Sequence, residues 1–274
     1  MVYGAGQWRY SYQGHDLIEH GGDIPGYVTQ VARFPDDNLG IIILSNDALG
    51  IFVMESVKFR IAEDILGLKE VDWIDRQEKQ WNKYVEEAQQ ITPRPATPKA
   101  PSAPFTSLAK ESFSHPSYGT LRPCLVPASV PVYSDSLFEF PQLQFECANL
   151  LSSHSVQRIL AATDLSTPTY IIYWKRFFVT HLRLAHFNEN LFNVTAIWSN
   201  AEVREEEGYS DGKGEANGDL LIGLDHHFEV EWVHGRNGQE QGLAFKGRFW
   251  GSGLDVRSPD GVGKESAEVW FAKQ

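Results

Sequence analysis

The first part of the chain alternates between apolar and polar residues in a way that is typical of strands. The alternation predicts four strands, at Trp8–Tyr12, Leu17–His20, Tyr27–Phe34 and Gly40–Ser45. Residues 13–16 form a hairpin-like connection, and Pro35-Asp36-Asp37-Asn38 forms a turn. Because Gly40–Ser45 is apolar on both faces, we expect it to be covered on both sides.

A four-residue repeat of apolar positions follows the alternation and predicts a helix from about Leu49 to Leu66. The repeat consists of Val53, Val57, Ile61 and Ile65. Gly67 lies where a helix C-cap is expected. A second helix is predicted from about Asp72 to Gln90, with one apolar side formed by Ile74, Trp81, Val85 and Ala88.

Proline then marks a boundary. Five of the 14 prolines fall between Thr92 and Pro104, where each fixes φ and removes a backbone donor. We therefore expect a stiff, extended linker over 92–104, with one domain over 1–91 and another over 105–274.

After this linker the pattern changes to about eight short β runs separated by glycine, asparagine, aspartate and proline. The runs are Leu121–Val126, Tyr170–Trp174, His181–Ala185, Phe192–Trp198, Asp219–Leu224, His227–Val233, Gly242–Trp250 and Glu268–Phe271. Without a convincing helix between them, they indicate a barrel or a sandwich. Five of the eight tryptophans lie here and are expected to fill the core, the alternative being that some line a pocket.

Charge and cysteine content narrow the classes of partner. The chain has 24 lysines and arginines against 36 aspartates and glutamates, a net charge of −12, which disfavours nucleic acid. Its apolar stretches are too short for a membrane-spanning helix, and its first residues do not resemble a secretory signal. Cys124 and Cys147 could form one disulfide or remain two free thiols. The cysteines therefore do not decide between an oxidising and a reducing compartment.

One set of motifs carries functional information. In chain order it comprises Tyr3–Trp8, Gly14-His15, Glu19–Tyr27, Phe34-Pro35 and Leu44-Ser45-Asn46. Together they resemble the C-terminal part of the catalytic domain in the serine β-lactamase-like family. That family includes class C β-lactamases, D-aminopeptidases, family VIII esterases and penicillin-binding proteins. Its third motif, Lys-Thr-Gly or often His-Gly-Gly, lies on an edge strand beside the nucleophile, and His20-Gly21-Gly22 resembles it.

The resemblance, which covers residues 3–68, implies a role for each residue of this motif. His20 could hold a substrate carboxylate or steer a proton. Gly21 and Gly22 remove side chains where a substrate lies along the strand. The backbone N–H of Asp23 falls where the family places an oxyanion-hole donor. In the alternative interpretation, His20-Gly21-Gly22 is a strand ending and His20 is a surface histidine.

The nucleophile of this family is not found in the sequence. The family uses a Ser-x-x-Lys pair before the third motif, and a second-motif Tyr or Ser. The two Ser-x-x-Lys strings here, at Ser107–Lys110 and Ser210–Lys213, both follow His20 and are interpreted as chance matches. We therefore expect no catalytic residue in this chain, which would be a truncated product or a C-terminal piece of a longer enzyme. Its apolar sheet face would be partly open.

A second resemblance concerns the part after the linker. Phe113–Gly119 is similar to the opening of the C-terminal β domain of archaeal and fungal S12-type peptidases, although Phe113 departs from the usual pattern. Such domains are lipocalin-like barrels. The implied fold is α+β: a partial antiparallel sheet with C-terminal helices as a β-lactamase-like remnant, then an all-β lipocalin-like barrel over 105–274.

Other candidate sites are weaker. His226–Glu231 could suggest a metal, but adjacent histidines on a strand point to opposite faces, so we expect no metal and no cofactor. Asn193-Val194-Thr195 is a glycosylation sequon, which matters only in a secreted protein.

Two hypotheses remain. In the first, the chain belongs to a serine hydrolase of amide or ester bonds and engages a small-molecule or peptide substrate only with its missing N-terminal part. In the second, it is a non-catalytic module whose barrel binds a partner or a small apolar ligand. Neither predicts contact with nucleic acid or membrane. Homo-oligomers could form through the exposed sheet or the barrel.

Overall fold

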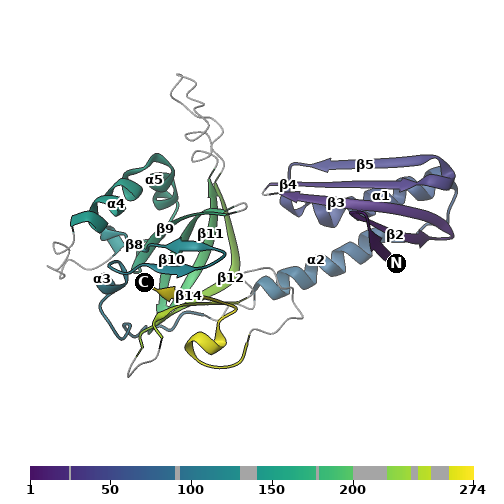
Figure 1. The fold of residues 1–274 in the computed structure, drawn as a ribbon. Helices are drawn as coiled ribbons and strands as arrows, with labels where there is room; N and C mark the ends of the chain where they lie inside the picture. Colours follow the sequence, from purple (N-terminus) through teal and green to yellow (C-terminus); the bar gives the residue numbers. More distant parts are fainter. Residues whose placement is uncertain are drawn as a thin grey trace, which may run out of the picture. The chain divides into compact units, whose positions relative to one another are not determined.

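A computed structural model describes residues 1–24, 26–89, 93–129, 141–176, 179–199, 221–235, 240–247 and 259–274. The chain divides into two compact units, Met1–Ile91 and Thr92–Gln274, here called unit 1 and unit 2 (Figure 1). The division falls at the start of the proline run. With about 30% helix and 41% strand, the fold is α+β.

Unit 1 is built on a five-stranded antiparallel sheet whose strands are neighbours in chain order. The strands are β1 (Val2–Gly4), β2 (Gln7–Tyr12), β3 (His15–Ile24), β4 (Tyr27–Phe34) and β5 (Leu39–Ser45). The last four correspond to the predicted strands, although β3 begins at His15 and continues to Ile24, beyond the predicted Leu17–His20. No pattern predicted β1. Gln13 and Gly14 have φ of 48° and 94°, the left-handed backbone that a tight hairpin turn requires.

Two helices complete unit 1, α1 (Ile51–Leu66) and α2 (Trp73–Gln89). As predicted, α1 ends at Gly67, whose φ is 65°. The four-residue repeat identifies α1 but not its buried face, because Val53 and Ile65 are each 61% exposed. The buried face is instead set by Phe59, which lies in the unit 1 core and stacks on Trp73 with ring centroids 4.1 Å apart.

The expectation that the last strand of the sheet is covered on both faces is wrong. On β5, Ile41 is buried in the core of unit 1, while Ile42 and Leu44 are 68% and 73% exposed. α1 covers one face of the sheet only, so the alternate residues of β5 remain at the surface. An apolar run therefore does not by itself show that both faces of a strand are covered.

Unit 2 contains a nine-stranded antiparallel sheet that curls into a half-barrel, in the order β7-β6-β14-β13-β12-β11-β10-β9-β8. The strands are β6 (Phe113–His115), β7 (Gly119–Leu121), β8 (Cys124–Leu125), β9 (Thr169–Arg176), β10 (Val179–Asn188), β11 (Leu191–Ser199), β12 (Leu221–Val233), β13 (Gly242–Lys246) and β14 (Val269–Lys273). β7 and β8 lie at opposite ends of this order, yet only Arg122 and Pro123 separate them. Three Cα–Cα steps span at most about 11 Å, so the two ends of the sheet must approach each other.

Several boundaries in unit 2 differ from the prediction. The expected run Leu121–Val126 is divided between β7 and β8 at Pro123, which lacks a donor for a ladder. The runs Asp219–Leu224 and His227–Val233 are joined in one strand, β12. The end of the run Gly242–Trp250, including Trp250, lies outside the described residues.

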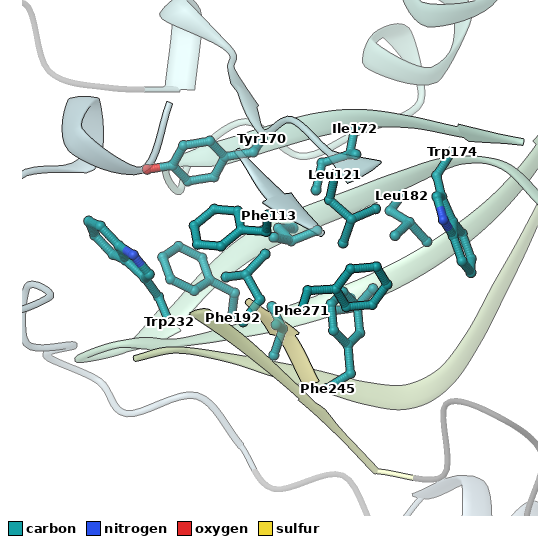
Figure 2. Close-up of a cluster of buried hydrophobic side chains, with 14 of the residues drawn as sticks. Phe113, Leu121, Tyr170, Ile172, Trp174, Leu182, Phe192, Trp232, Phe245 and Phe271 are labelled. Carbon is teal, nitrogen blue, oxygen red and sulfur yellow. The ribbon is translucent and has the colours of Figure 1, made fainter. Parts of the chain in front are cut away.

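Aromatic side chains fill the core of unit 2. In Figure 2, Phe113, Phe192 and Phe271 come from three different strands and point toward one another among other buried residues. Trp174 and Trp232 are buried in the same cluster, which confirms the expected core role for these two tryptophans. Trp198 and Trp270 are half-buried.

Unit 2 also contains helices, which the expectation of an all-β domain missed. They are α3 (Phe105–Leu108), α4 (Pro141–Ser152) and α5 (His154–Ala161). Ser153 caps α5 by accepting a hydrogen bond from the Val156 backbone N–H. Val156 and Ile159 then pack on Ile171 and Ile197 of the sheet. A disulfide joins Cys124 of β8 to Cys147 of α4, which settles the open question of cysteine pairing.

The proline segment is attached to unit 2 rather than extended away from it. The Lys99 backbone N–H donates to Asn188 Oδ1 over 2.9 Å, and the Glu189 N–H donates to the Lys99 carbonyl over 2.8 Å. Ser102 donates its N–H to Asn190 Oδ1 over 2.8 Å. Although proline prevents the segment from joining the sheet, polar groups at the β10–β11 turn hold it in place.

This attachment can be tested by proteolysis. Asn188→Ala removes the acceptor for the Lys99 N–H, and a hydrogen bond of this kind contributes about 1 kcal/mol. We expect trypsin to cleave native protein after Lys99 about fivefold faster in this variant, since cleavage follows the population of the opened segment. Asn193→Ala, at an exposed position of β11, is the matched control. Equal cleavage rates in the two variants would contradict the attachment.

Candidate functional site

The predicted site residues lie in the second half of β3. β2 pairs with β3 from His15 to Glu19, and β4 pairs with β3 from Ile18 to Ile24. Among the described strands, β3 therefore has β4 as its only ladder partner from His20 onward. By strand order β3 is an interior strand, which corrects the expected edge strand. The half that carries the motif nevertheless has an edge character.

His20 is exposed on the sheet face that α1 does not cover. Its register partner on β4 is Val31, and the partner of Val31 on β5 is Ile42, so all three residues lie in one row. Val31 and Ile42 are 40% and 68% exposed. The imidazole Nε2 lies 3.3 Å from the Tyr3 hydroxyl. We call the side chains of His20, Val31, Ile42 and Leu44 the open face.

Gly21 and Gly22 are constrained by the neighbouring strand. A Cβ at Gly22 would lie 2.5 Å from Thr29 Oγ1, and one at Gly21 would lie 3.3 Å from the Thr29 carbonyl oxygen. Thr29 therefore accounts for part of the requirement for glycine without any substrate. Asp23 pairs with Val28, and its side chain is exposed.

Beneath this half of β3, between the sheet and α1, lies a polar cluster that the sequence analysis missed. Lys58 is fully buried, and its Nζ lies 2.7 Å from Glu19 Oε2 and 2.6 Å from Glu55 Oε1. Gln30 donates to both carboxylates, over 3.1 and 2.6 Å. Tyr10 donates its hydroxyl to Glu19 over 2.5 Å. Burial and this carboxylate both raise the pKa of Tyr10, so its proton stays in place.

A signal for this cluster was present in the sequence. Glu19 directly precedes His20 in a strand, so the two side chains point to opposite faces. If His20 faces the surface, Glu19 must point under the sheet and needs a cation there. A cavity of about 230 Å³ adjoins the cluster, lined by Gly21, Gly22, Gln30, Glu55 and other residues of β3, β4 and α1.

No serine–lysine pair lies beside His20 in the part of unit 1 that the structure describes. Ser107 and Lys110 belong to unit 2, where the Lys110 N–H donates to the Ser107 carbonyl at the end of α3. Ser210 and Lys213 lie outside the described residues. Gln30 and Lys58 can orient carboxylates and donate hydrogen bonds, but they supply no attacking hydroxyl.

The remaining predictions concern a metal site and a membrane-spanning helix. Within the described ranges, no group of three or more histidine, cysteine, aspartate or glutamate side chains could hold a metal ion. The side chains of His226 and His227 lie outside them. No helix in these ranges has both the length and the apolar character to cross a membrane.

Comparison with family models, with curated proteins and with solved structures gives no match for this chain. The resemblance to serine β-lactamase-like proteins therefore rests on the sequence motifs around His20.

Proposed function

We propose that unit 1 forms one wall of an acyl-transfer site of the serine β-lactamase type. In this proposal His20, Gly21, Gly22 and the Asp23 N–H form the border of a substrate site. The attacking serine and its lysine come from a segment outside this chain, so the chain alone hydrolyses neither amides nor esters.

The edge character of β3 from His20 onward is the observation that carries the proposal. A strand half with one ladder partner presents backbone groups along which an extended substrate can lie. His20 lies beside this edge with an exposed imidazole, a side chain that can hydrogen-bond a substrate or relay a proton. The exposed Ile42 and Leu44 lie on the same face as His20. Exposed apolar residues of this kind are expected where a further segment of the protein covers the sheet.

The test combines this chain with the segment encoded directly upstream of it. We expect that segment to contain Ser-x-x-Lys and a second-motif Tyr or Ser. Co-expression of the two parts should then give turnover of nitrocefin or of p-nitrophenyl butyrate, whereas the chain alone should give none. His20→Ala should lower the turnover of the combined protein by about 100-fold, because a positioned acid–base group contributes at least that much.

His154→Ala, at an exposed histidine of unit 2, is the matched control and should leave turnover unchanged. Turnover by the chain alone that is lost in His20→Ala would overturn the claim that the nucleophile lies elsewhere. An upstream segment without Ser-x-x-Lys would overturn the assignment to this class of hydrolase.

A further inference from the structure

A cavity of about 500 Å³ lies in unit 2, and none of its lining residues belongs to unit 1. One wall is the end of the curled sheet, with Thr120 of β7, Arg122 and Pro123. The opposite wall is α4, with Cys147 and Leu150. This volume is within the range of sites for small organic molecules, about 300–1,000 Å³.

The cavity exists because two consecutive strands lie at opposite ends of the sheet. The chain must pass from β7 to β8 through Arg122 and Pro123, and α4 lies over this passage. α4 is attached to β8 by the bond between Cys124 and Cys147, whose Cα atoms are 5.3 Å apart. The two sulfur-bearing residues line the cavity themselves. The disulfide therefore fixes the distance between the two walls.

The lining combines an apolar interior with one ion pair. Ala109, Pro123, Leu150 and the ring of Tyr173 supply apolar surface, as does the disulfide. Arg122 donates through Nη1 to Glu146 Oε2 over 2.5 Å, and both side chains are about half exposed. A guanidinium has five N–H donors in a planar fork, so Arg122 retains donors for a second anion.

We propose that this cavity binds a small amphipathic anion, with its apolar or aromatic body against Leu150 and Tyr173 and its acidic group at Arg122. Because α4 forms one wall, binding depends on the Cys124–Cys147 bond. The proposal does not depend on the function proposed for unit 1. It also places the ligand outside the barrel interior, which aromatic side chains fill (Figure 2).

The probe is 1-anilinonaphthalene-8-sulfonate, an aromatic body with one sulfonate, titrated into the full chain and followed by its fluorescence. All variants carry Ile42→Glu and Leu44→Glu, so that the open face of unit 1 loses apolar surface and repels the anionic probe. We expect saturable binding at one site. Thr120→Trp fills the cavity from an exposed position and should weaken binding at least tenfold, whereas Asn193→Trp, exposed on β11, should not.

Arg122→Gln should weaken binding about tenfold, because it removes a charge-assisted hydrogen bond. Lys264→Gln breaks an exposed ion pair with Glu240 elsewhere in unit 2 and is its control. Near-ultraviolet circular dichroism shows whether Thr120→Trp folds. If it does not fold, Arg122→Gln still tests the proposal.

Reduction tests the role of the disulfide. Dithiothreitol passes two electrons and two protons to the Cys124–Cys147 bond and becomes a cyclic disulfide, which leaves two thiols in the protein. We expect at least tenfold weaker binding after reduction and in Cys124→Ser/Cys147→Ser. Absence of saturable binding, equal binding in Thr120→Trp and Asn193→Trp, or unchanged or stronger binding after reduction would overturn the proposal.

Discussion

Replacing Lys58 with methionine is expected to lower the free energy of unfolding of unit 1 by about 3–5 kcal/mol, because it leaves two partly buried carboxylates without their cation. The Lys58 side chain is fully buried, and those of Glu19 and Glu55 are 13% and 29% exposed. Their remaining donors, Gln30 and Tyr10, are neutral and cannot replace the charge. Hydrogen exchange measured by mass spectrometry during urea titration follows the peptides of unit 1 separately from those of unit 2.

Lys79→Met is the matched control. Lys79 pairs with Asp75 over 2.6 Å on the exposed side of α2, and such surface pairs contribute about 0–1 kcal/mol. The triple variant Lys58→Met/Glu19→Gln/Glu55→Gln removes the uncompensated charges and should recover most of the lost stability. If Lys58→Met were no more destabilising than Lys79→Met, the cluster would not be a structural charge centre.

The strand pattern of unit 1 could be predicted from the sequence because the sheet is a simple antiparallel meander. Each strand pairs with the next one along the chain, so local alternation and turn residues are sufficient. Tyr27–Phe34 has the predicted bounds, and Gly67 ends α1 as expected. Long-range pairing in unit 2 was not accessible in this way, since β6 pairs with β14 across more than half of the chain.

The elements that cover each face of a sheet could not be predicted, because they are distant in sequence from the strands that they cover. The apolar run of β5 suggested two covered faces, although α1 packs on only one. The helices α4 and α5 were overlooked, although Ser153 followed by Val156 and Ile159 is a capped helical pattern. Proline at 93–104 indicated an extended linker, and only the structure shows its hydrogen bonds to the β10–β11 turn.

For the candidate site, the motif identified the strand but not its surroundings. His20 lies at the surface in either interpretation, as a substrate contact or as a strand ending, so its exposure alone does not distinguish them. What the structure adds is the pairing: β2 stops at Glu19 and leaves the next residues with β4 alone, while β3 continues to Ile24. A register of this kind cannot be deduced from a tripeptide.

The second large effect is expected in the core of unit 2, where Phe245→Ala should lower its free energy of unfolding by about 3–5 kcal/mol. Phe245 on β13 is fully buried, and its ring centroid lies 5.3 Å from that of Phe271 on β14 (Figure 2). Truncation leaves a cavity that strands paired on both sides cannot close. The measurement is urea unfolding followed by hydrogen exchange in the peptides of β13 and β14.

Phe145→Ala on α4 makes the same chemical change at a position that is 67% exposed, and it should change stability by less than about 0.5 kcal/mol. Comparison of the two variants separates the loss of packing from the loss of a phenyl group as such. Unit 1 peptides should exchange at unchanged rates in both variants, because Phe245 belongs to the core cluster of unit 2. Equal effects of the two substitutions would mean that the half-barrel lacks the packed aromatic core described above.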